Sequence, residues 1–247
     1  MTHRKKLSTI VGTVLGIGVI AFVVIRGAVA RGASQLNDPT ALVPEKDLKE
    51  VRAPLPQGPT ADGTSIDLLD LLQFPKDVIA GVWGFQDRAL ITSGVQWGRL
   101  QVPVIPPQEY DLSLKVSRKR GVGSLNIGFV QNGRQGMLVV DADEGKLSYF
   151  SVSDTGEPAD DETRSVGKVL KWNRQCRINL FVRNEKVAVT VDGKTLIEYQ
   201  GRETRFAFRP GWNVAHPKAL FLGTWESIFR IDEMTLKPIT GTLTPLR

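Results

Sequence analysis

Cysteine and histidine are almost absent from this sequence. The chain has 247 residues, with one cysteine, Cys176, and two histidines, His3 and His216. A single cysteine excludes a disulfide within the chain, and so few Cys and His side chains exclude a zinc site built from them. Serine nucleophile motifs, glycine-rich phosphate loops and metal-binding His pairs are also missing. We therefore expect no metal and no cofactor, and we expect Cys176 to be buried and unreactive.

Acidic residues are absent from residues 1–31, which hold five of the 32 Lys and Arg residues. Removing these five charges from the formal net charge of +6 leaves +1 for residues 32–247. In that remainder the basic cluster Arg118–Arg120 is short and precedes Gly121, so we interpret it as a turn. Nucleic-acid binding needs a concentrated basic face, and the sequence therefore argues against a nucleic-acid partner.

Charge is also absent from Leu7 to Ile25, a run of 19 residues. A helix of this length, at about 1.5 Å per residue, would span about 28 Å, close to the bilayer core of about 30 Å. We predict a basic cytoplasmic tail at 1–6 and a transmembrane helix or signal anchor at 7–26, because basic flanks stay in the cytoplasm. Ala28 and Ala30 also permit a cleaved signal peptide. Either interpretation exports the rest of the chain to the periplasmic or extracellular side of the membrane.

Aromatic residues are missing from residues 32–65, where proline and glycine are frequent. Such a segment cannot bury enough apolar surface to offset its ordering entropy. We predict a disordered linker over 27–65, with one short helical turn near Glu45–Val51, that holds a folded domain away from the membrane.

The sequence after residue 65 is typical of β-structure. The run from Tyr110 to Val116 alternates apolar and polar residues, and period two indicates a strand with one buried face. Asn132-Gly133 and Asp192-Gly193 each separate two strand-like runs, as tight hairpin turns do. After residue 80 no segment keeps a helical period, and Ile66–Leu72 is the one helix candidate in the domain.

These patterns predict an all-β domain at 66–240, a two-sheet antiparallel jelly-roll sandwich, followed by a tail at 241–247. Its core should hold the inward-facing members of the alternating runs. They are Leu112, Leu114, Val116, Leu125, Ile127, Phe129, Leu138, Val140, Ile178, Leu180, Val182, Val189, Val191, Leu220, Leu222, Phe229 and Ile231.

Three segments carry a resemblance to a known family. They are Pro106–Leu112 ahead of a strand, Val189–Lys194 followed by Ile197–Gly201, and Ala219–Trp225. These segments resemble the concanavalin A-like, laminin-G-like jelly-roll domains of planctomycete type and, more loosely, the 3-keto-disaccharide hydrolase group. The resemblance covers residues 66–240, and it implies a two-sheet sandwich whose concave face often binds glycans.

Glu109 and Asp111 are a candidate catalytic or binding pair, because two residues apart on a strand their carboxylates share one face. Concanavalin-like glucanases carry Glu-x-Asp and then a second Glu on one strand, and retaining glycosidases need two carboxyl groups about 5–5.5 Å apart. Ser113 or Leu114 stands here in place of the second Glu, which removes the acid/base partner. The acids of Asp141–Glu144 do not match the spacing of a calcium loop, and we interpret them as a hairpin loop.

Tryptophan supplies the other candidates, since an aromatic face can pack on a sugar ring. Trp212 and Trp225 lie near turns, which would leave them open to a ligand, whereas Trp83 is expected in the core. The sequence therefore predicts a membrane-anchored, extracytoplasmic, lectin-like domain that binds a glycan or surface polymer without catalysis, through Glu109, Asp111, Trp212 and Trp225. Two alternatives stay open: a glycoside hydrolase-type enzyme using Glu109 and Asp111, and a structural protein-interaction module. The oligomeric state is not predicted.

Overall fold

The computed structural model describes residues 48–50, 65–201 and 205–247. The predicted cytoplasmic tail at 1–6, the predicted membrane segment at 7–26 and most of the predicted linker lie outside these residues. Among the residues that are described, no helix is both long and apolar enough to cross a membrane.

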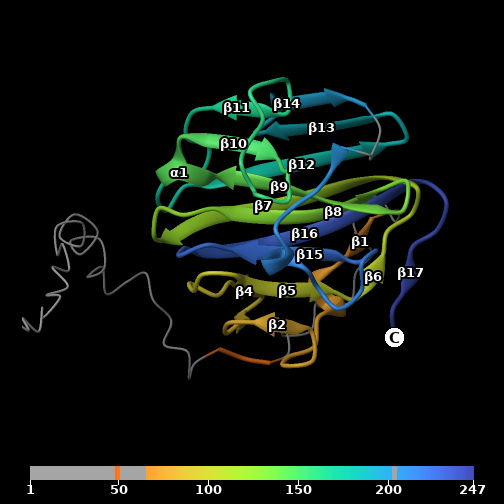
Figure 1. Cartoon of the computed structure of the whole chain (residues 1–247). Helices are drawn as coiled ribbons and strands as arrows, with labels where there is room; N and C mark the ends of the chain where they lie inside the picture. The colour runs from red at the N-terminus through yellow and green to blue at the C-terminus, as the bar shows by residue number, and fades with distance from the viewer. Residues whose placement is uncertain (1–47, 51–64, 202–204) are drawn as a thin grey trace, which may run out of the picture.

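The domain is built from two antiparallel sheets packed face to face, as the alternating runs predict (Figure 1). Sheet A contains β1 (Ile66–Asp67), β3 (Gly84–Gln86), β4 (Ala89–Ile91), β7 (Glu109–Arg120), β12 (Gln175–Arg183), β13 (Lys186–Val191), β14 (Lys194–Gln200) and β16 (Ile228–Thr240). Its strand order is β14-β13-β12-β7-β16-β4-β3, and β1 pairs with β16.

Sheet B contains β2 (Val78–Ala80), β5 (Gly98–Val102), β8 (Leu125–Gln131), β9 (Arg134–Asp141), β10 (Leu147–Phe150), β11 (Arg164–Val166) and β15 (Leu220–Thr224). Its order is β11-β10-β9-β8-β15-β5-β2. A small third sheet joins β6 (Val104–Ile105) to β17 (Thr244–Pro245). The short segment labelled α1 covers Ala142–Gly145, within which Asp143 and Glu144 have left-handed and not helical backbone.

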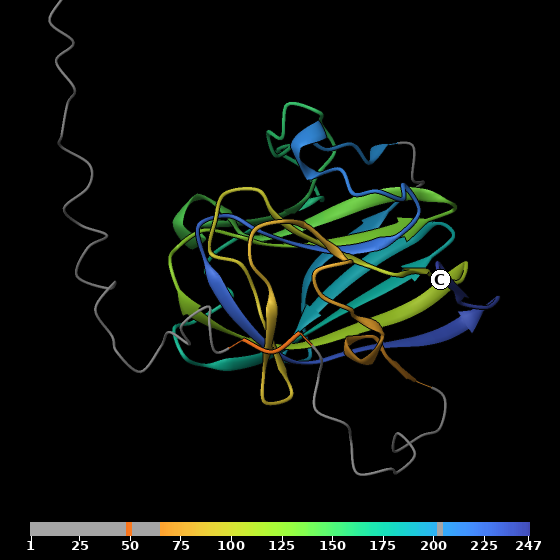
Figure 2. The ribbon, with the colours of Figure 1, turned by 90° about the horizontal axis from the view of Figure 1, so that it is seen from below.

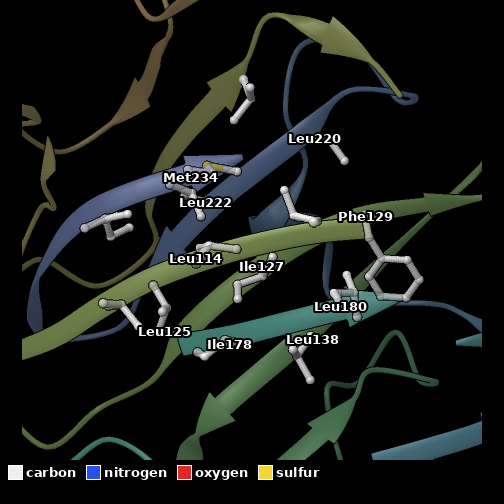
Figure 3. Packing of buried hydrophobic residues seen from close by; sticks show 14 of the residues in the cluster. Leu114, Leu125, Ile127, Phe129, Leu138, Ile178, Leu180, Leu220, Leu222 and Met234 are labelled. Carbon is white, nitrogen blue, oxygen red and sulfur yellow. The ribbon is translucent and has the colours of Figure 1, made fainter. Parts of the chain in front are cut away.

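The inward-facing side chains of the two sheets form one core. Figure 3 shows Leu114 and Ile178 of sheet A beside Ile127 and Leu222 of sheet B. Every predicted core residue is buried in this cluster except Val191, which is partly buried and packs against it. The period-two pattern therefore predicts the facing sides of the sandwich correctly.

The two predicted hairpin turns are confirmed. Asn132 and Gly133 have φ angles of 49° and 79° between β8 and β9, and Asp192 and Gly193 have 48° and 79° between β13 and β14. Both central residues of each turn are left-handed, the backbone that Asn-Gly and Asp-Gly accept most readily.

Four expectations at the margins of the domain are corrected. Arg118–Arg120 is the end of β7 and not a turn, and Ile66–Leu72 forms β1 and a single 3-10 turn at Leu69–Leu71 in place of a helix. The predicted tail at 241–247 packs onto the domain, because β17 pairs with β6 and the Arg247 guanidinium binds the Asp77 carboxylate. Within the predicted linker, residue 49 is paired with Phe85 in a β-bridge, so its backbone is extended and not helical.

The outer face of sheet B is covered, unlike an ordinary solvated sheet face. A second apolar cluster lies on it, formed by Met137, Val139, Tyr149 and Phe221 of the sheet together with Trp212. Figure 2 shows the blue segment that carries the 3-10 turn Pro210–Trp212 and a green loop lying outside the sandwich, above one sheet. A hollow lies between these covering segments and the outer face of sheet B.

Candidate functional site

Glu109 and Asp111 lie on the outer face of sheet A, where alternate residues of β7 point away from the core. The Asp111 carboxylate forms an ion pair with Arg183, with 2.6 Å between Oδ1 and Nη2. The Glu109 carboxylate accepts hydrogen bonds from the Asn184 backbone N–H at 3.1 Å and from the Thr240 hydroxyl at 3.3 Å. Both carboxylates therefore hold neighbouring chain segments together.

Trp212 and Trp225 lie over the outer face of sheet B, on the other side of the sandwich. Both pack on Trp97, with ring centroids 4.9 Å apart for Trp97 and Trp212 and 5.0 Å apart for Trp97 and Trp225. Contrary to the expectation that Trp212 is open to solvent, its side chain is 7% exposed, because it packs within the second apolar cluster and against the ring of Trp97. The four predicted site residues thus form two pairs on opposite outer faces, and not one site.

One row of residues across sheet B forms the floor beneath the tryptophans. The register places Gly223 of β15 opposite Asn126 of β8, Asn126 opposite Val139 of β9, and Val139 opposite Tyr149 of β10. A Cβ atom on Gly223 would lie 2.8 Å from Cζ3 of Trp212. Only glycine at this position lets the indole lie directly on the sheet.

The floor, the tryptophans and the surrounding loops enclose a hollow of about 400 Å³, which we call the tryptophan pocket. Four of its lining residues have left-handed backbone, with φ of 58° at Trp97, 48° at Asp143, 59° at Glu144 and 50° at Glu226. Residues other than glycine reach this region at a cost of about 1–2 kcal/mol, and such strain gathers at ligand-binding sites.

Two polar side chains of the tryptophan pocket lack partners. Asn126 is 1% exposed and Ser151 is 0% exposed. Across the described part of the chain, neither the Asn126 Oδ1 and Nδ2 atoms nor the Ser151 Oγ atom has a hydrogen-bond partner. A buried polar group left in this state costs about 1–3 kcal/mol. The pocket therefore has unused hydrogen-bonding capacity at its base.

The rim of the tryptophan pocket is more acidic than basic. Among the described residues it holds the carboxylates of Asp143, Glu144 and Glu226 and a single guanidinium, that of Arg209. Asp143 is 3.3 Å from the Lys146 ammonium, whereas Glu144 has no ion-pair or hydrogen-bond partner within the described ranges. A ligand that brings further negative charge is disfavoured at this rim.

Tyr149 contributes a neutral hydroxyl to the same pocket. Its phenol donates to the Gly156 carbonyl at 3.3 Å. Burial raises the pKa of Tyr149, the Glu157 carboxylate raises it further, and Arg209 opposes the change. The phenol therefore stays protonated at neutral pH and can exchange hydrogen bonds with a polar ligand.

Within the residues described, no group of three or more His, Cys, Asp or Glu side chains is placed to hold a metal ion. The acids at the end of β9 and in the segment that follows it point in different directions. The Asp141 carboxylate turns inward to Arg118, and Asp143 faces Lys146. Cys176 is 6% exposed, as expected, and burial raises the pKa of its thiol to about 12, so it is unreactive.

Sequence patterns indicate Trp212 and Trp225 as ligand contacts and Asp143 and Glu144 as acids of a hairpin loop, but they do not indicate the other side chains of this pocket. Asn126 stands on the predicted wetter face of its strand, where a polar residue is ordinary, and nothing local shows that it becomes buried. Trp97, Tyr149 and Ser151 carry no distinguishing pattern. Trp212 could be proposed as a ligand contact from its residue type alone. The place of the other side chains in the pocket depends on which strands become neighbours in the sheet.

Solved structures of several other proteins are similar to this chain. A candidate glycosyl hydrolase from Parabacteroides distasonis has 13% identity and a TM-score of 0.47, and the match covers 72% of this chain and 95% of that one. A Bacillus subtilis protein of unknown function with a galectin-like fold has 10% identity and a TM-score of 0.45, covering 64% and 86%. The carbohydrate-binding module CBM66 from Bacillus subtilis has 13% identity and a TM-score of 0.39, covering 65% and 94%.

No family model matches the sequence, and no curated protein matches it. The structural likenesses agree with the resemblance to concanavalin A-like jelly rolls and with the two-sheet sandwich. Their TM-scores are below 0.5, so these likenesses do not indicate a function for this chain.

Proposed function

We propose that this domain binds a glycan in the tryptophan pocket and does not act on it chemically. The observation that carries the proposal is the meeting of three indoles, those of Trp97, Trp212 and Trp225, with the unpartnered Asn126 amide. An indole packs well against the apolar C–H face of a pyranose. An amide both donates to and accepts from sugar hydroxyls. Ser151 adds a hydroxyl that can do the same.

The negative charge of the pocket rim indicates which class of glycan should bind. Asp143, Glu144 and Glu226 outnumber Arg209, so neutral or amine-bearing glycans should bind more tightly than uronates or sulfated sugars. A pocket of about 400 Å³ lies within the range of about 300–1,000 Å³ that is usual for small ligands.

The glycoside hydrolase alternative gains no support from the predicted carboxylates. Glu109 and Asp111 lie on the opposite outer face from the tryptophan pocket, and they are engaged by Arg183, Asn184 and Thr240. The protein-interaction alternative remains as an outcome of the binding experiment.

A glycan array probed with the full-length protein tests the proposal. Trp225→Ala should weaken binding of the best neutral glycan at least about tenfold, because central aromatic contacts carry much of a binding energy. Trp172→Ala is the matched control, since Trp172 is also partly buried but does not line the pocket. Absence of any binder on the array, or equal effects of the two substitutions, would contradict glycan binding and favour the interaction module.

We also propose that residues 7–26 anchor the protein in a membrane, with residues 1–6 in the cytoplasm and the domain on the exported side. The uncharged run Leu7–Ile25 and the basic residues before it support this arrangement. A C-terminal fusion to alkaline phosphatase, which is active only outside the cytoplasm, should be active. An inactive but intact fusion would contradict it.

A further inference from the structure

A second cavity, of about 340 Å³, lies where edges of the two sheets meet. Figure 1 shows β14, an edge strand of sheet A, beside β11, an edge strand of sheet B. We call this cavity the lysine pocket. Its lining includes the basic side chains of Lys168, Lys171 and Lys194 and the aliphatic side chains of Val169, Val191 and Leu196.

The floor of the lysine pocket is aliphatic. Val169, Val191 and Leu196 are partly buried and pack against the main core. Cys176 is 6% exposed and stays a protonated, neutral thiol. An alkyl chain placed here would extend the core of the sandwich and remove apolar surface from water.

The mouth of the lysine pocket is cationic. The ammonium groups of Lys168, Lys171 and Lys194 have no hydrogen-bond or ion-pair partner in the part of the chain that the structure describes. Asp192 carries the one carboxylate among the described lining residues, and it is already engaged. It accepts the Arg177 backbone N–H at 2.9 Å and lies 4.0 Å from the Arg174 guanidinium. Three positive charges are therefore left at the edge of an apolar hollow.

Two simpler ligands fit these features poorly. A bare inorganic anion would bind the cations but leave the aliphatic floor in water. A neutral sugar would find no aromatic ring on which to pack, because none of the described residues that line this pocket is Trp, Tyr or Phe. The combination of cations and an aliphatic floor matches a ligand with one anionic end and one alkyl end.

We propose that the lysine pocket binds a small amphiphilic anion, a carboxylate carried on a short saturated chain. The chain lies over Val191 and Leu196, and the carboxylate lies among Lys168, Lys171 and Lys194. The site is separate from the tryptophan pocket and opposite to it in charge, so the glycan proposal and this one can fail independently.

Calorimetric titration of the full-length protein with sodium octanoate tests the proposal. Octanoate should bind more tightly than glycerol phosphate, which offers the anion without the chain, and more tightly than octyl glucoside, which offers the chain without the anion. Raising the salt concentration from about 0.01 M to 0.15 M should weaken octanoate binding, because these charges are exposed to screening.

A double substitution, Lys171→Gln with Lys194→Gln, should weaken octanoate binding about tenfold. Both lysines are exposed, so the fold should survive, which circular dichroism can verify. Lys218→Gln is the matched control, because Lys218 is exposed and does not line this pocket. Equal octanoate affinity in wild type and the double variant would overturn the proposal, as would glycerol phosphate or octyl glucoside binding as tightly as octanoate.

Discussion

Arg118 and Asp141 form an ion pair inside the sandwich, with 3.1 Å between Nη2 and Oδ2 and side chains exposed by 1% and 0%. The Asp141 carboxylate also accepts the backbone N–H groups of Val169 at 2.7 Å and Leu170 at 2.8 Å. Arg118 in turn donates to the Gly123 carbonyl at 2.6 Å. Since Gly123 lines the tryptophan pocket and Val169 lines the lysine pocket, this one pair fixes backbone at both sites.

Asp141→Asn should destabilise the fold by about 3–5 kcal/mol, because it leaves the Arg118 guanidinium buried without its counter-charge. Burial lowers the pKa of Arg118 and Asp141 opposes that change, but a guanidinium does not lose its proton in a protein. Asparagine tolerates the left-handed backbone at position 141, where φ is 59°. The measurement is the free energy of unfolding in urea.

Asp143→Asn is the control for this substitution. Asp143 lies two residues further along the chain and is also left-handed, and its ion pair with Lys146 has side chains exposed by 60% and 64%. Exposed pairs contribute about 0–1 kcal/mol. Similar losses in the two variants would show that the loop, and not the buried charge, sets the stability.

The strands could be predicted from the sequence because burial alternates with every residue, as in β7. For Arg118 the alternation alone does not lead to the correct prediction. By alternation it belongs to the inward run that begins at Tyr110, a face on which a charged residue is not expected, and the preceding Ser117 is buried as well. A buried arginine requires a counter-ion, and Asp141 is 23 positions away. Only the pairing of strands brings the two together, so a basic cluster before glycine looked like a turn.

The tryptophan pocket could also be predicted only in part from the sequence. Trp212 and Trp225 are conspicuous as residue types, and they do meet on one face. The row through Gly223, Asn126 and Tyr149 depends on three strand registers. No local sequence pattern predicts any of these registers. Glu109 and Asp111 shared a face as predicted, but that face belongs to the other sheet.

Asn126→Leu should affect the stability of the domain and its affinity for a glycan differently. The amide is buried without partners, so replacing it with an apolar group of similar size should leave the free energy of unfolding unchanged or raise it by about 1 kcal/mol. Glycan affinity should fall at least about tenfold, because the ligand loses its hydrogen bonds at the floor. Denaturation without ligand and titration with the array-selected glycan measure the two effects.

Asn179→Leu provides the comparison for this prediction. Asn179 is also central in a strand, but its amide donates to the Thr190 hydroxyl at 3.3 Å on the outer face of sheet A. This variant should bind the glycan as the wild type does. Should Asn126→Leu also bind normally, the floor amide has no part in recognition.

Asp161 should make stability depend on pH in the acid range. Burial alone would raise the pKa of this carboxyl, but hydrogen bonds from Thr163 and Arg205 outweigh it and lower the pKa to about 2, from 3.8. A depressed folded-state pKa stabilises the fold above the unfolded value and loses that contribution as the pH falls. The loss should occur between about pH 4 and pH 2.

Asp161→Asn should therefore show a smaller fall in unfolding free energy than the wild type across this window, measured by urea denaturation at several pH values. Asp154→Asn, in the same loop region and exposed, should follow the wild-type curve. An Asp161→Asn curve parallel to that of the wild type would mean that the contacts with Thr163 and Arg205 do not favour the charged carboxylate.

Gly223→Ala should weaken glycan binding more than it lowers the free energy of unfolding. Gly128→Ala should lower the free energy of unfolding more than it weakens glycan binding. A Cβ on Gly223 would meet Trp212 at 2.8 Å and the Asn126 Cβ at 3.2 Å, and Trp212 can yield toward the pocket beside it. A Cβ on Gly128 would overlap the ring of Phe221, which is 0% exposed and cannot move aside. Overpacking of this kind costs about 1–3 kcal/mol, so Gly128→Ala should lower the free energy of unfolding most, while Gly223→Ala should weaken glycan binding several-fold. If Gly223→Ala binds the glycan with wild-type affinity, the position of the Trp212 indole does not matter for recognition, and the ligand must contact the domain elsewhere.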